Sequence, residues 1–64
     1  MTRREILEEM LAYLRKALAK SRDNLHKHQT GVWSSDPKYI SQSEATVAKW
    51  ERWVNFISAE LDEN

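Results

Sequence analysis

The sequence predicts an all-α fold in which two long helices form an antiparallel hairpin, and three observations carry this prediction. Apolar residues recur at alternating steps of three and four in both halves of the chain. The single glycine and the single proline both lie in the stretch between the halves. Helix-capping sequences precede both apolar patterns. We therefore expect one helical-hairpin domain over residues 1–64, with helices over about 3–29 and 42–62 and a loop over 30–41.

The first helix is expected to begin after Thr2, because residues 2–5 have the S/T-x-x-E form of a capping box. Strong helix formers predominate from there to Gln29. Thr30 and Gly31 then offer a left-handed stop. A heptad seam runs along this helix, formed by Leu7, Leu11, Leu14, Leu18, Ser21, Leu25 and His28. The seam predicts that the helix packs at a shallow angle on another helix.

The apolar surface of the first helix is wider than one partner helix needs. A second row repeats beside the seam and consists of Ile6, Met10, Tyr13 and Ala17. The two rows together cover an arc of roughly 160° at 100° per residue, whereas a helix with one neighbour needs a stripe of roughly 100°. We expect this helix to contact more than one neighbour.

The start of the second helix has two possible positions in the sequence. Asp36 followed by Pro37 would make an N-cap with proline in the first helical position. Residues 41–44 form a second capping box, which would start the helix at Gln42. We favour Gln42 as the start of the regular helix, with at most a single helical turn over 37–40 before it.

The second helix carries its own heptad seam, formed by Val47, Trp50, Val54, Ile57 and Leu61. Trp53 and Phe56 lie off this seam, and two large aromatic side chains one turn apart are unusual on the surface of a small monomer. Two hairpins associating as an antiparallel four-helix bundle would cover the surplus, so a homodimer is expected. In the alternative, a monomer, the loop would fold back over the excess through Val32, Trp33, Tyr39 and Ile40.

The composition argues against catalysis and against bound cofactors. The chain has no cysteine and one glycine, which excludes cysteine-based zinc sites and glycine-rich phosphate loops. His26 and His28 point about 160° apart on a helix, so they cannot share a metal ion. Apolar runs are too short for a membrane span or a signal-peptide core. We expect a cytoplasmic protein that is not an enzyme, needs no metal or cofactor and binds no membrane.

The net charge of zero hides an asymmetry between the two halves of the chain. Residues 1–30 carry seven basic and four acidic side chains, and residues 31–64 carry three basic and six acidic ones. The basic residues toward the loop end are Arg15, Lys16, Lys20, Arg22 and Lys27. Such a basic end with aromatic neighbours could bind RNA or another phosphate ligand, although a dedicated nucleic-acid protein usually carries a large net positive charge.

In size and build the inferred hairpin resembles the plasmid-encoded Rop family, whose hairpins dimerise into a four-helix bundle and bind RNA. The resemblance is architectural, since the regular small–large layering of the Rop core is missing and the loop here is longer. It implies a helical dimer and keeps RNA binding as the alternative function; no site residue is carried over.

The leading expectation is a small protein–protein interaction module that acts as a helical homo-oligomer. It would regulate, link or inhibit a larger protein, as compact inhibitors from phages and mobile elements do. The candidate contacts with that partner are at the loop end, at Trp33, Asp36, Lys38 and Tyr39. The candidate oligomer interface consists of Ile6, Met10, Tyr13, Ala17, Trp53 and Phe56.

Overall fold

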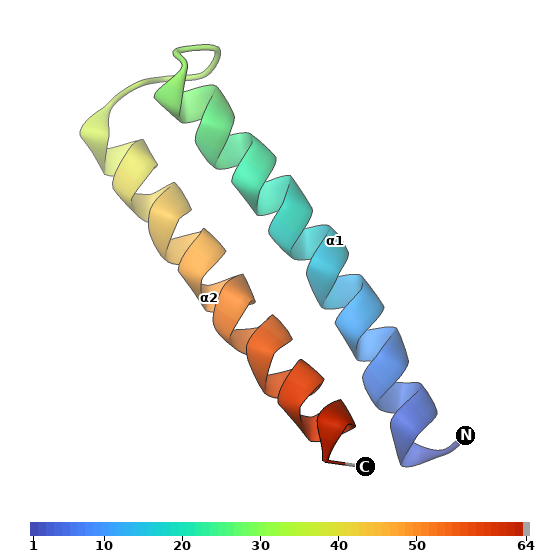
Figure 1. Ribbon diagram of the computed structural model, residues 1–64. Coiled ribbons are helices and arrows are strands. Elements are labelled where there is room, and N and C mark those ends of the chain that lie inside the picture. The colour runs from blue at the N-terminus through green and yellow to red at the C-terminus, as the bar shows by residue number, and fades with distance from the viewer. Residues whose placement is uncertain (64) are drawn as a thin grey trace.

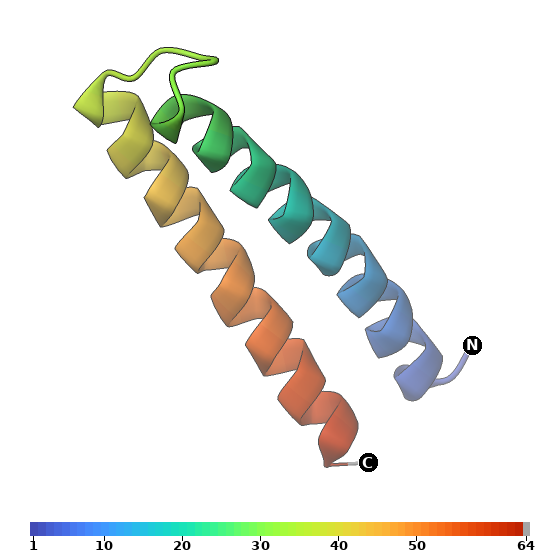
Figure 2. The same cartoon turned by 45° about the horizontal axis from the view of Figure 1, so that its top comes forward.

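The computed structural model describes residues 1–63 and contains two helices, α1 over Arg3–Gln29 and α2 over Pro37–Asp62. They lie side by side and antiparallel, so that the two ends of the described chain are neighbours and the loop lies at the opposite end (Figures 1 and 2). Residues 1–63 form no strand. The predicted two-helix hairpin is confirmed.

Helix α1 begins and ends where the sequence predicts. The Glu5 amide donates to Oγ1 of Thr2 at 3.2 Å, and the Thr2 hydroxyl donates to the Glu5 carboxylate at 3.2 Å, which closes the cap through side chains. At the other end the Thr30 amide donates to the His26 carbonyl at 2.9 Å. Gly31 then has φ +81°, the left-handed conformation that turns the chain out of the helix.

Helix α2 begins at Pro37, five residues before the start predicted at Gln42, so the prediction of a loop over 30–41 is wrong. Asp36 is the N-cap, and its Oδ1 accepts from the Lys38 amide at 2.9 Å. Proline fits the first helical position, because an amide at that position has no partner within the helix.

The second capping sequence, residues 41–44, therefore lies inside α2. The first turn is held instead by the Asp36 carbonyl, which accepts from the amides of Tyr39 at 2.9 Å and Ile40 at 3.2 Å. Starting the helix at Pro37 adds a turn and a half of α2 that can pack against the end of α1. Ile40 lies in that added stretch and is half-buried.

The core forms where the two predicted seams pack against each other. All twelve seam residues are buried or half-buried. Its centre is a cluster of Leu11, Leu14 and Ile57, with Leu7, Trp50, Val54 and Leu61 packed against it. No large side chain within residues 1–63 is fully buried, because each keeps at least 2% of its surface exposed. Two helices thus enclose a single thin layer of side chains.

The hairpin is elongated, with principal extents of 44 × 15 × 12 Å. Its radius of gyration is 14.4 Å, against about 10.7 Å for a typical domain of this length. Its accessible surface is 4776 Å², against about 4300 Å² expected for a monomer of this mass. In such a shape each helix packs against only one other helix, and a large part of its surface stays exposed.

Candidate protein-interaction site

One flank of the hairpin is apolar and exposed, and we call it the open face. Tyr13 is 68% exposed, Trp53 is 51% exposed and Phe56 is 61% exposed. These side chains lie outside the seam, in the second row of α1 and its counterpart on α2. The open face comprises Ile6, Met10, Tyr13, Ala17, Trp53 and Phe56; of these only Ala17 is half-buried and the others are exposed.

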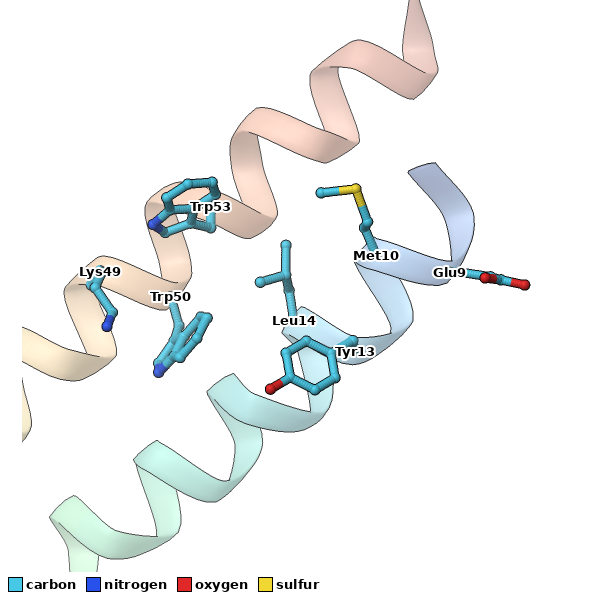
Figure 3. Close-up of a pocket in the computed structure, with 7 residues that line it drawn as sticks. All are labelled: Glu9, Met10, Tyr13, Leu14, Lys49, Trp50 and Trp53. Carbon is cyan, nitrogen blue, oxygen red and sulfur yellow. The ribbon is translucent and has the colours of Figure 1, made fainter. Parts of the chain in front are cut away.

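The centre of the open face is a groove of about 540 Å³ between the two helices. Met10 and Tyr13 form its wall on α1, and Trp50 and Trp53 form its wall on α2 (Figure 3). Leu14 lies between the walls and belongs to the hairpin core, so the groove is open down to the core. Its width, set by the spacing of two packed helices, suits a further helix.

The groove continues along α2 beyond Trp53. A neighbouring hollow of about 390 Å³ is lined by Arg52, Trp53 and Phe56. Charged residues border the groove, with Glu9 on the side of α1 and Lys49 on the side of α2. The ammonium group of Lys49 lies 4.7 Å from the ring centroid of Trp50. Sequence reasoning missed Lys49 and Arg52, although their interleaving with two tryptophans over residues 49–53 is a usable signal.

The loop packs on the end of α1 and does not reach the open face. The Trp33 amide donates to the Lys27 carbonyl at 3.0 Å, and the Lys27 ammonium lies 4.8 Å from the Trp33 ring centroid. Val32 is 70% exposed. The loop therefore closes the end of the hairpin and leaves uncovered the apolar surface that the monomeric alternative required it to cover.

His28 organises this loop cluster, which consists of Lys27, His28, Trp33 and Tyr39. Its Nδ1–H donates to the Ser34 carbonyl at 2.7 Å. Its ring meets Trp33 edge-on, with centroids 5.3 Å apart, and stacks on Tyr39 at 5.9 Å. The sequence places His28 at the end of the seam but gives no sign of this role, which depends on the path of the loop.

The four candidate contacts at the loop end differ in what they do within the hairpin. Asp36 caps α2, so its carboxylate is already engaged. Lys38 is exposed in the first turn of α2. Trp33 and Tyr39 pack on His28 and remain 42% and 45% exposed. The structure thus brings two of the four, Trp33 and Tyr39, onto the same His28 ring.

The basic residues toward the loop end lie on two different sides of the hairpin. Arg15 and Arg22 lie on the face opposite the open face, and Arg22 pairs with Glu51 at 3.8 Å. Lys27 pairs with Asp23 at 3.0 Å and also contacts Trp33. The other two basic residues, Lys16 and Lys20, are exposed on the outer side of α1, to which Lys27 also belongs. Three lysines thus share the outer side of α1, while the two arginines lie on the face opposite the open face.

Residues 1–63 contain no group of three histidine or acidic side chains that could hold a metal ion. Over the same residues, neither helix combines the length and the apolar character needed to cross a bilayer. No protein-family model, curated protein or solved structure matches this chain.

Proposed function

We propose that this chain is a small non-catalytic interaction module whose working form is a helical homodimer, with the open face of each copy covering that of the other. The single observation that carries the proposal is the open face itself. The two helices are packed on each other and the loop lies on the end of α1, and Tyr13, Trp53 and Phe56 are still more than half exposed. Exposed aromatic surface on this scale marks an interaction site in soluble proteins.

The amount of exposed apolar surface supports a stable contact. An aromatic side chain contributes on the order of 200 Å², so the exposed parts of Tyr13, Trp53 and Phe56 amount to on the order of 350 Å² per copy. Ile6 and Met10 add to this, and stable interfaces bury about 800 Å² on each partner. Two hairpins joined face to face would bury these side chains together with the aliphatic stems of Lys49 and Arg52.

The second part of the proposal is that the dimer acts on a larger protein, as regulator, adaptor or inhibitor, through its loop ends. Trp33 and Tyr39 are held by His28 in fixed positions with nearly half of their surface exposed. Aromatic residues held in place in this way lose little entropy on binding and are frequent binding hot spots. RNA or phosphate binding at the same end is the competing function. The basic side chains support it less, because they are divided between two sides of the hairpin and two of them pair with acidic residues.

The homodimer is tested by measuring the mass in solution of the wild type and of two matched variants. The chain of 7.6 kDa is expected to behave in light scattering as a particle of twice that mass. Trp53→Lys should give a helical monomer, because it places a charge in the groove. Asn55→Lys, two residues away on the opposite face, is the control and should stay dimeric. A wild-type monomer at high micromolar concentration would refute the homodimer.

A further inference from the structure

The open face is apolar over only part of the hairpin. Toward the loop, the same side carries a polar cleft of about 240 Å³, lined by Ser21, Asn24, His28, Tyr39, Gln42, Ser43 and Thr46. Asn24 lies seven residues after Ala17, and Thr46 lies seven residues before Trp53, so each points in the same direction as its apolar counterpart. A symmetric partner that covers only the apolar part must therefore be displaced along the hairpin axis.

We infer that a second copy of this chain covers the open face across a twofold axis perpendicular to the helices. The axis passes between Leu11 and Ala12 of α1 and between Val54 and Asn55 of α2. Helix α1 then packs antiparallel on α1 of the partner, and α2 packs antiparallel on α2 of the partner. The inference rests on the proposed homodimer and specifies its register.

The side chains of the open face are complementary to themselves about this axis. On α1, Ile6 stands opposite the partner's Ala17, so that a large residue faces a small one, and Met10 stands opposite the partner's Tyr13. On α2, Trp53 stands opposite the partner's Phe56. Alternation of large and small residues lets facing layers interdigitate, and an aromatic pair adds to the energy of the buried area.

The two helices place the axis at the same level of the hairpin. In the core, Leu11 packs with Ile57, and in the groove Met10 stands across from Trp53. The α1 midpoint between Leu11 and Ala12 is therefore level with residues 53–57 of α2, and the α2 midpoint lies within that stretch. The two helices have unrelated sequences, so this agreement comes from the arrangement of the open face as a whole.

A twofold axis that stacks two open faces can run perpendicular or parallel to the helices, and the charges at the borders of the face favour the perpendicular axis. Across the perpendicular axis, Glu9 lies near the partner's Lys16, and Lys49 lies near the partner's Glu60. Glu60 already binds Arg3 of its own chain at 2.7 Å, so Lys49 would extend that pair. A twofold axis parallel to the helices would instead bring Lys16 and Lys20 against the partner's Lys49 and Arg52, and like charges facing each other disfavour association.

The inferred register also explains where the face becomes polar. A half-turn about the axis covers residues 3–20 of α1 and 47–62 of α2 with the same stretches of the partner, and it leaves the loop end of each copy projecting. Every residue that lines the polar cleft lies in the projecting part. At 1.5 Å per residue the covered length is about 27 Å, so two hairpins of 44 Å give a dimer about 60 Å long.

Charge reversal with mixing tests the register. Glu9→Lys and Lys16→Glu are each expected to weaken dimerisation about tenfold at low salt, because symmetry replaces two attractive pairs with two repulsive ones. When the two variants are mixed, the facing positions become complementary again, and a heterodimer of near wild-type affinity should form. Arg15→Glu and Glu44→Lys, on the opposite face, are the control pair and should change nothing, alone or mixed.

A wild-type dimer whose charge variants are not rescued by mixing would overturn the register and leave the homodimer standing. A monomeric wild-type chain would overturn both. Small-angle X-ray scattering supplies an independent reading, since the inferred dimer has a maximum dimension of about 60 Å and the parallel-axis dimer would remain near the 44 Å of one hairpin. A scattering length near 44 Å for a confirmed dimer would also reject the inferred axis.

Discussion

The ring of His28, in the last turn of α1, lies nearly parallel to the ring of Tyr39, in the first turn of α2. Their centroids are 5.9 Å apart and the angle between the planes is 14°. The hydrogen bond from Nδ1 of His28 to the Ser34 carbonyl, 2.7 Å long, joins the loop to the same ring. One side chain thus connects both helices and the loop.

We expect His28→Ala to lower the free energy of unfolding by about 1–2 kcal/mol, because it removes a hydrogen bond and two ring contacts. Urea unfolding followed by circular dichroism, at one protein concentration throughout, measures this. His26→Ala is the matched control, since the His26 side chain is exposed on the same turn. Equal losses for the two variants would mean that the loop cluster adds nothing to stability.

The start of α2 can be tested by comparing two capping candidates. Asp36→Ala should cost about 1 kcal/mol, because it removes the acceptor of the Lys38 amide. Ser41→Ala should be neutral or slightly stabilising, since residue 41 lies inside the helix and alanine is the better helix former. The reverse order of the two losses in thermal unfolding would place the start of the helix near Gln42.

The end of α1 depends on the left-handed backbone of Gly31, whose φ is +81°. A Cβ at this position has room, with its nearest neighbour at 3.5 Å, so the cost of a substitution lies in the backbone. We expect Gly31→Ala to lower stability by about 1 kcal/mol. Gly31→Asn should cost less, because asparagine tolerates this conformation better. Equal midpoints for glycine and alanine would argue against the left-handed stop.

Substitutions at two neighbouring positions of α1 should distinguish an effect on folding from an effect on dimerisation. Leu14 is 7% exposed and Tyr13 is 68% exposed. Leu14→Ala should cost about 2–5 kcal/mol, which is comparable to the whole stability of a small hairpin, and so abolish the helical signal. Tyr13→Ala should keep the signal at high concentration and raise the dimer dissociation constant. If both variants unfold alike, the open face is needed for folding itself.

The loop end is tested by capture of partners from the native host with wild type and Trp33→Ala. We expect the variant to lose the partner while keeping the dimer, because Trp33 lies in the projecting part of the hairpin. Binding through aromatic contacts should change little between low and moderate salt, whereas phosphate-driven RNA binding should weaken steeply. Equal capture by both proteins would remove Trp33 from the site, and steep salt dependence would favour RNA.

The sequence predicted the helical seams, the first cap and the glycine stop because each depends on short-range periodicity or on local hydrogen bonding. All twelve seam residues are buried or half-buried. It also singled out Tyr13, Trp53 and Phe56 as surplus apolar residues, since their angle to the seam follows from helix geometry. The choice between Pro37 and Gln42 went wrong because both capping sequences are locally valid, and the proline start gains an additional helical turn packed on α1.

Other features were decided only by the tertiary structure, because they join residues distant in the sequence. Periodicity assigns Met10 and Trp53 to surplus rows on separate helices, but only the rotation of each helix in the hairpin places them across one groove. The route of the loop, which brings the ring of His28 into contact with both Trp33 and Tyr39, likewise cannot be predicted from any local sequence pattern. The sequence by itself determined which apolar side chains two helices cannot cover, and packing decided that these side chains form one continuous face.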